Sequence, residues 1–212
     1  MIADAAHELG LEGLTLRLVA DHLNVSISAL YHYVGGSEDL MRAAAERSAQ
    51  AIPLPTHHGQ TWAQWLLDWG HYNHAVFTTQ PGLLGQYLEG AIGLESVLTN
   101  LDIILGVLVD EGFTIGQAND AYRLVSATAV GFAIAEKRER DMAADAGGTD
   151  AIRHVLKSTP TTQLRNIRRL FKERRTQPGS SFEQSLEPVL RGIAIANNLP
   201  WQPVVHHGPA KA

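Results

Sequence analysis

The 212 residues hold 45% hydrophobic and 18% charged residues, a formal net charge of −5 and no cysteine. This composition favours a folded chain over disorder, and the missing cysteine excludes disulfides, thiolate nucleophiles and cysteine-based zinc sites. The longest apolar run, residues 103–109, is far shorter than the ~20 residues of a membrane span. We therefore expect a cytoplasmic protein with no membrane partner.

Residues 1–33 predict three short helices. The first spans residues 1–9, has an apolar face of Ile2, Ala5, Ala6 and Leu9, and ends at Gly10. Thr15 is a good N-cap for the second helix, in which apolar residues recur at helical spacing as far as Leu23. Asn24 tolerates the left-handed backbone of a sharp turn, and Ser26 and Ser28 follow as caps of the third helix.

This pattern of helix, tight turn and helix is typical of a DNA-binding motif. We expect Val25 and Leu30 to pack on Ala20, whose small side chain lets the two helices cross closely. Four residues then face outward, as in a helix that enters the major groove of DNA: Ile27, Ser28, His32 and Tyr33.

Helical patterns continue through the middle of the chain. A helix runs from Ser37 to about Gln50, and the Pro- and Gly-containing residues 52–60 form a connection. Thr61 caps a helix with one apolar side, which is followed by a short irregular helix at 83–90 and an apolar helix at 94–109. The apolar side of the Thr61 helix consists of Trp62, Trp65, Leu66, Trp69, Tyr72 and Val76.

The last third of the chain predicts three more elements. A long helix spans about 117–138, and its small residues allow a second helix to approach closely, as in a dimer interface. Residues 139–160 are polar and contain glycine, which indicates a long mobile loop. One helix starts at Thr161 or Thr162 and ends by Pro178 and Gly179, and Ser181 caps the final helix. No strand pattern occurs, so the fold class is all-α with about ten helices.

Motifs near both ends resemble tetracycline-repressor-type (TetR family) regulators. They are Glu-Gly-Leu-Thr at 12–15, Val-Ala at 19–20, Leu-Tyr-His-Tyr at 30–33, Gly-Gly-Ser-Glu-Asp-Leu at 35–40 and the stretch from Phe182 to Gly192. The resemblance implies a helix-turn-helix DNA-binding domain at 1–50, a helical ligand-binding and dimerisation domain at 51–199 and a flexible tail at 200–212. Family members usually have a basic arm before the first helix, so we expect the natural chain to extend upstream of Met1.

The resemblance also implies the DNA contacts, which are Arg17, Ile27, Ser28, Ala29, Tyr31, His32, Tyr33 and Ser37. Among these, Arg17 alone can make a bidentate guanine contact. Tyr31 has an alternative role in packing the helices together. Against DNA binding, residues 1–50 hold three basic and seven acidic residues, whereas phosphate contacts require Lys and Arg.

For a small-molecule ligand we expect Trp69, Asn73, Phe77 and Tyr122, with ordinary core packing as the alternative for each. His71 and His74 are spaced to share a metal, but no third ligand is evident, so we expect neither metal nor cofactor. The basic run between Arg165 and Arg175 flanks an apolar stripe and favours a solvated helix face over a second nucleic-acid site.

No catalytic triad, phosphate loop or dinucleotide motif occurs, so an enzyme is disfavoured. We expect a homodimeric transcriptional repressor that binds double-stranded operator DNA and is released by an unknown small molecule. The acidic N-terminal region leaves open a helical ligand-binding or scaffold protein without DNA binding. A helical enzyme with a metal at His71 and His74 is a third alternative.

Overall fold

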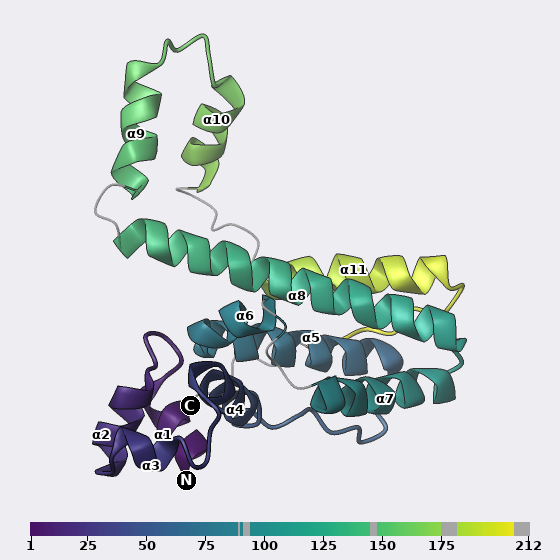
Figure 1. The fold of residues 1–212 in the computed structure, drawn as a ribbon. Coiled ribbons are helices and arrows are strands. Elements are labelled where there is room, and N and C mark those ends of the chain that lie inside the picture. Colours follow the sequence, from purple (N-terminus) through teal and green to yellow (C-terminus); the bar gives the residue numbers. More distant parts are fainter. Residues whose placement is uncertain (89, 91–93, 145–147, 175–181, 206–212) are drawn as a thin grey trace.

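The structure, a computed structural model, describes residues 1–88, 90, 94–144, 148–174 and 182–205 (Figure 1). These residues form eleven helices and no strand, which confirms the all-α fold class. The helices are α1 (Ile2–Leu9), α2 (Leu16–Leu23), α3 (Ile27–Leu30), α4 (Ser37–Ala49), α5 (Trp62–Thr79), α6 (Pro81–Leu88), α7 (Leu94–Asp110), α8 (Ile115–Ala144), α9 (Gly148–Ser158), α10 (Arg165–Arg174) and α11 (Phe182–Ala196).

Helices α1 to α4 form the head, which we define as residues 1–50. Small buried residues on α1 and α4, including Ala6 and Ala44, allow these two helices to pack closely. Arg47 Nε of α4 donates a hydrogen bond to Asp4 Oδ1 of α1 at 2.6 Å. The packed pair of α1 and α4 therefore supports the two short helices α2 and α3.

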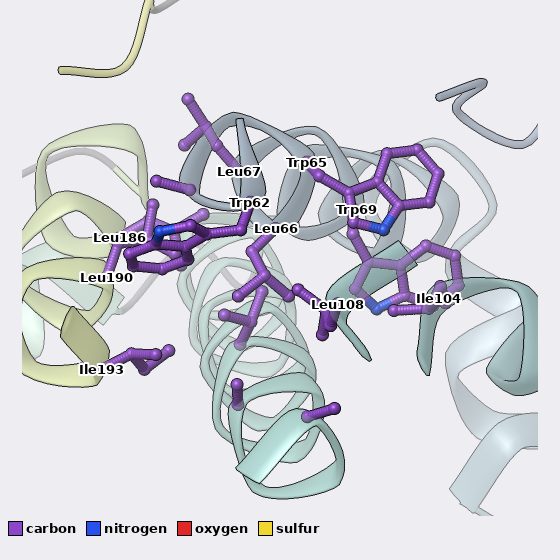
Figure 2. Packing of buried hydrophobic residues seen from close by; sticks show 14 of the residues in the cluster. Trp62, Trp65, Leu66, Leu67, Trp69, Ile104, Leu108, Leu186, Leu190 and Ile193 are labelled. Carbon is purple, nitrogen blue, oxygen red and sulfur yellow. The ribbon is translucent and has the colours of Figure 1, made fainter. Parts of the chain in front are cut away.

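The body, residues 51–205, is organised around α5 and α8, which pack along each other. Trp62, Trp65 and Trp69 of α5 are at most 4% exposed and lie in one apolar cluster. Figure 2 shows Trp62 beside Leu186 and Leu190 of α11, and Trp69 beside Ile104 of α7. The tryptophan stripe of the sequence therefore forms the centre of the body, as its spacing predicts.

Head and body share a second apolar cluster. Leu11, Leu14 and Leu30 of the head lie in the same cluster as residues of α5, α6 and α8, namely Val76, Phe77, Leu83, Leu84 and Ala133. Lys137 Nζ of α8 also lies 3.8 Å from Glu12 Oε1. A displacement of these body helices would therefore be transmitted to the head through direct packing.

Gly82 lies at a close contact between head and body. A Cβ atom there would lie 2.5 Å from Leu11 Cβ and 3.2 Å from the Glu12 backbone nitrogen, neither of which can rotate away. We expect Gly82→Ala to lower the free energy of unfolding by about 1–3 kcal/mol through overpacking. Gly85→Ala is the matched control, because a Cβ atom at Gly85 on the same helix would meet nothing within 4 Å.

Urea denaturation of both variants measures this effect. Gly85→Ala should be neutral or slightly stabilising, because alanine is the better helix former. Equal stabilities for the two alanine variants would contradict a tight contact between α6 and the head.

The predicted loop at 139–160 is wrong. Helix α8 continues to Ala144, and α9 occupies Gly148–Ser158. Helix formers such as Met142 and Ala144 extend α8, and Lys137 pairs with Asp141 one turn later at 3.2 Å. The polarity of the segment reflects an exposed helix face, and only 145–147 interrupt the described helices.

Other boundaries shift by a few residues. Helix α8 begins at Ile115 rather than 117, because Thr114 and Gln117 form a capping box. Thr114 Oγ1 accepts from the Gln117 backbone N–H at 3.3 Å, and Gln117 Oε1 accepts from the Thr114 backbone N–H at 2.8 Å. Helix α10 begins at Arg165, after Leu164 in a left-handed conformation (φ 54°). The predicted stop at Pro178 and Gly179 and the Ser181 cap lie outside the described residues.

Residues 200–205, which the sequence assigns to a flexible tail, lie along the body instead. Gln64 holds both backbone groups of Val205, since its Nε2 donates to the carbonyl at 3.2 Å and its Oε1 accepts from the N–H at 2.8 Å. The Arg191 guanidinium lies 4.4 Å from the centre of the Trp201 ring. Among the described residues, no helix has the length and apolar character needed to cross a membrane.

Candidate nucleic-acid interface and ligand cavity

Three local hydrogen-bonding arrangements build the predicted helix-turn-helix. Thr15 Oγ1 accepts from the Leu18 N–H at 3.2 Å and starts α2. Asn24 ends α2 in the left-handed conformation, with φ 54° and ψ 44°. Ser26 Oγ then accepts from the Ala29 N–H at 3.2 Å and starts α3. The sequence predicts all three capping roles.

Leu30 anchors α3 to the head. Its side chain is 2% exposed and lies in one cluster with Val19 and Ala20 of α2. Val25, which the sequence also places against Ala20, is 43% exposed, so this prediction is wrong. The Val25 N–H bonds to the Ala20 carbonyl at 2.9 Å, which fixes the backbone of the turn while the side chain faces solvent.

The predicted DNA contacts lie on α2, α3, the turn after α3 and the first residue of α4. Seven of the eight are exposed: Arg17, Ile27, Ser28, Tyr31, His32, Tyr33 and Ser37, whereas Ala29 is half-buried. Tyr31 is 56% exposed and Tyr33 is 78% exposed. The alternative in which Tyr31 packs between the helices is therefore wrong.

Arg17 is available for an external contact. Its side chain is 82% exposed, and its only described ion pair is with Asp21 at 3.9 Å. An exposed pair of this length contributes little, so the guanidinium can leave Asp21 at small cost. By contrast, Asp39 is engaged within the head, since its carboxylate accepts from the Gly35 N–H at 2.9 Å and pairs with Arg42.

Two of the predicted ligand residues lie together in the body. The rings of Trp69 and Tyr122 have centroids 5.8 Å apart, and Trp69 Nε1 donates to Ser126 Oγ at 3.0 Å. Burial raises the pKa of the Tyr122 hydroxyl, and a hydrogen bond with Ser126 partly opposes this shift. Tyr72 stacks on Trp69 at 5.2 Å, and burial raises its pKa as well.

The other two predicted ligand residues make different contacts. Asn73 Nδ2 donates to the Trp69 carbonyl of its own helix at 3.3 Å. Phe77 belongs to the cluster that joins head and body, where its ring is 4.9 Å from that of Tyr87. Trp69 and Tyr122 therefore pack in the tryptophan cluster, whereas Phe77 packs in the cluster shared with the head.

A cavity of about 440 Å³ lies where the end of α4 and the connection to the body meet α5 and α7. Its lining includes Glu46, Gln50, Leu54, Tyr72 and Asn100. A smaller space of about 40 Å³ lined by Trp65 and Trp69 shares Leu54 and Asn100 with it. Sequence reasoning missed the cavity residues on α4 and α7, because no pattern within one helix reveals which other helix faces it.

A second hollow of about 440 Å³, open to solvent, lies between α6 and α8 and is lined by Tyr87, Tyr122 and Ser126. Trp69 contacts Tyr72 of the first cavity and Tyr122 of the second, so an aromatic wall lies between the two. Helical spacing could have found Ser126, which is one turn beyond Tyr122.

His71 and His74 take part in packing around α11. The His74 ring stacks on Phe182 at 4.3 Å, and its Nε2 lies 3.0 Å from Glu136 Oε1 of α8. The His71 ring meets the edge of Phe182 at 5.8 Å. The described part of the chain contains no group of three or more possible metal ligands.

Known proteins share this arrangement. The class A tetracycline repressor of Escherichia coli, from transposon 1721, is 28% identical over 198 residues, which are 90% of this chain and 86% of the repressor. An HTH-type transcriptional repressor of Mycobacterium tuberculosis is 23% identical over 172 residues, 75% of this chain but only 63% of that protein. No protein-family model matches the chain.

The fold matches solved structures over almost its full length. The crystal structure of the TetR family protein ActR from Streptomyces coelicolor, in complex with actinorhodin, covers 92% of this chain and 96% of its own, with a TM-score of 0.69 and 20% identity.

In sequence and in fold the chain is similar to TetR-type transcriptional regulators. The curated relatives are regulators rather than enzymes. Helices α2 and α3 form the helix-turn-helix whose motifs the sequence shows at residues 12–40.

Proposed function

We propose that this chain is a homodimeric, ligand-responsive repressor of the TetR type that binds operator DNA in the cytoplasm. The observation that supports it most is the rigid presentation of α3, which is capped by Ser26, anchored by Leu30 and exposed along its outer side. A short helix held in this way can lie against base edges in the major groove.

The chemistry of the exposed residues assigns their roles. Arg17 would read guanine, and Ile27 and Ala29 would meet thymine methyl groups. Ser28 and His32 would lie near bases or the backbone, while Tyr31, Tyr33 and Ser37 would contact phosphates. Because the head is acidic, its affinity for DNA should be modest and should depend on these few contacts.

A second copy would pack on the outer side of α8 and α11. Leu124 and Ile134 of α8 are 48% and 41% exposed, and Ile195 of α11 is 82% exposed. Added Cβ atoms at Gly131 and Gly192 would meet nothing within 4 Å, so backbone surface is open on both helices. Exposed apolar side chains beside open backbone suit helix packing between subunits.

The ligand would occupy the cavity beside α4. Tyr72 and the nearby Trp69 suit a planar, apolar molecule, and Asn100 and Gln50 can orient it by hydrogen bonds. Because Glu46, Ala49 and Gln50 are part of the cavity wall, a ligand that displaces the end of α4 would change the separation of the two heads. Its effect on DNA release is limited by its differential affinity for the two states.

Arg17→Ala should weaken operator binding by about 1–3 kcal/mol, which is roughly 5- to 150-fold in affinity, and leave the fold unchanged. The operator is first selected from random DNA fragments, and a shift assay then gives the affinities. Arg138→Ala on α8 is the control, since it removes an exposed arginine far from α3 in the sequence. Equal affinities of the wild type and Arg17→Ala would count against the assigned interface.

The acidic head favours one other function, a helical ligand-binding protein without DNA binding. Selection from random DNA at low and at moderate salt distinguishes a repressor from a ligand-binding protein without DNA binding. A repressor enriches one sequence whose affinity falls with salt, whereas a protein without DNA binding enriches none.

A further inference from the structure

Glu46 brings a negative charge to the cavity beside α4. It is the only charged residue among the described residues that line this cavity, and its side chain is half-buried. Arg42, one turn before it, pairs with Asp39. Arg47, the next residue, pairs with Asp4 at 2.6 Å. None of the ion pairs between described residues includes Glu46, so its carboxylate charge is not balanced within the described part of the chain.

The groups around this carboxylate are neutral. Burial raises the pKa of the Tyr72 hydroxyl, so Tyr72 adds no charge at physiological pH. Gln50 and Asn100 contribute amides, and Leu54 contributes an apolar side chain. A partly buried carboxylate with no cation nearby is costly, and a ligand cation would relieve that cost. The face of the Tyr72 ring also attracts a cation.

A second polar group without a described partner lies next to the cavity. The Trp65 side chain is 1% exposed, and its Nε1–H has no acceptor among the described residues. Trp65 lines the space of about 40 Å³ that shares Leu54 and Asn100 with the cavity. Figure 2 shows Trp65 beside Trp69, whose own Nε1 donates to Ser126. A space of this size holds one small polar group, which the Trp65 N–H would bind as an acceptor.

We propose that the ligand is a planar aromatic compound with a cationic amine at one end and a hydrogen-bond acceptor, such as a ring carbonyl, at the other. This inference rests on the proposed function, because it names the chemical class that the cavity beside α4 accepts. The cation pairs with Glu46, the ring system lies along Tyr72, and the acceptor oxygen enters the smaller space beside Trp65. The cavity volume of about 440 Å³ suits a drug-sized molecule.

Three acridone probes test the charge of the ligand. Acridone has three fused rings and a ring carbonyl, and the probes carry N-propyl chains that end in a dimethylamino, an isopropyl or a carboxylate group. The dimethylamino probe is cationic at neutral pH. Fluorescence titration of the full chain should give an affinity about 10-fold or more higher for this probe than for the neutral or the anionic one, because charge-assisted bonds are the stronger ones. Equal affinities, or no binding of any probe, overturn the proposed class.

Glu46→Gln shows whether this residue recognises the cation. The substitution keeps the side-chain shape and removes the charge, so the affinity for the cationic probe should fall by about 10-fold and that for the neutral probe should not change. Glu38→Gln is the matched control, because it removes the same charge from an exposed position on α4. If both variants bind the cationic probe equally well, Glu46 does not recognise it.

Trp65→Phe shows whether the indole N–H binds the acceptor. The variant should lose about 5- to 10-fold in affinity for the cationic acridone, but nothing for the dihydroacridine with a CH₂ group in place of the carbonyl. Trp62→Phe is the matched control, because Trp62 is 2% exposed, its Nε1–H also lacks an acceptor among the described residues, and it is not among the described residues that line either space. Circular dichroism and thermal unfolding check that each variant is folded.

The outcomes distinguish the ligand class from the proposed function. If selection from random DNA enriches no sequence, the repressor fails whatever the probes do. If an operator is found but the cationic probe has no advantage, the repressor stands and the ligand class is overturned. In the wild type, equal affinities for the acridone and the dihydroacridine would show that the ligand does not use the Trp65 N–H, which overturns the acceptor part of the proposal without any variant.

Discussion

Replacing Trp65 with alanine is expected to lower the free energy of unfolding by about 3–5 kcal/mol. The Trp65 side chain is 1% exposed and lies within the cluster that joins α5, α7, α8 and α11. Its loss leaves a cavity that the surrounding helices can fill only in part, because they also pack on one another. Guanidinium denaturation followed by circular dichroism measures the change.

Two control variants show whether the loss of stability in Trp65→Ala results from the burial of this side chain. Trp65→Phe keeps an aromatic ring and removes an indole N–H that has no acceptor among the described residues, so it should cost much less than alanine. Leu98→Ala changes a residue on α7 that is 53% exposed and should have an effect within about 0.5 kcal/mol. If Trp65→Ala and Leu98→Ala were equally stable, the tryptophans of α5 would not form the centre of the body.

Interactions between neighbouring residues were predictable from the sequence. The caps at Thr15 and Ser26 and the left-handed turn at Asn24 depend on residue types within four positions of each other. The burial of Trp62, Trp65 and Trp69 also follows from helical spacing, since apolar residues on one side of a helix must be covered by something. Spacing within a helix does not identify the covering element.

Helix α5 illustrates this limit. Trp69 and Phe77 lie two turns apart on similar sides of the helix, and the sequence assigns both to one ligand site. In the structure Trp69 lies in the cluster formed with α7, α8 and α11, whereas Phe77 lies in the cluster shared with the head. Their neighbours come from distant parts of the chain, and only the tertiary fold separates the two environments.

The segment 139–160 illustrates the opposite case, because its polar sequence predicts a loop whereas the described residues form exposed parts of α8 and α9. Its residues are polar because α8 and α9 extend into solvent there, and the helical conformation depends on local propensity rather than on burial. The same exposure leaves the apolar residues of α9 and α10 uncovered. Both features arise because α9 and α10 lie outside the core that α5, α7, α8 and α11 form.

Leu30→Ala should lower the local stability of the head by about 2–5 kcal/mol and abolish operator binding at concentrations that saturate the wild type. Leu30 is 2% exposed, and it alone is fully buried in the four-residue α3, so its truncation removes the anchor that holds this helix against α2. Hydrogen exchange measured by mass spectrometry should show faster exchange in residues 16–34, and a shift assay with the selected operator should show the loss of binding.

Ile27→Ala on the same helix distinguishes the anchoring of α3 in the head from the contact of α3 with the operator. Its side chain is 41% exposed, so truncation should change stability by no more than about 0.5 kcal/mol while it removes an apolar contact to the operator. Exchange in residues 16–34 should then match the wild type, whereas DNA affinity should fall. If Leu30→Ala binds the operator as tightly as the wild type, α3 does not need its fixed position to bind DNA, and its assignment as the recognition helix fails.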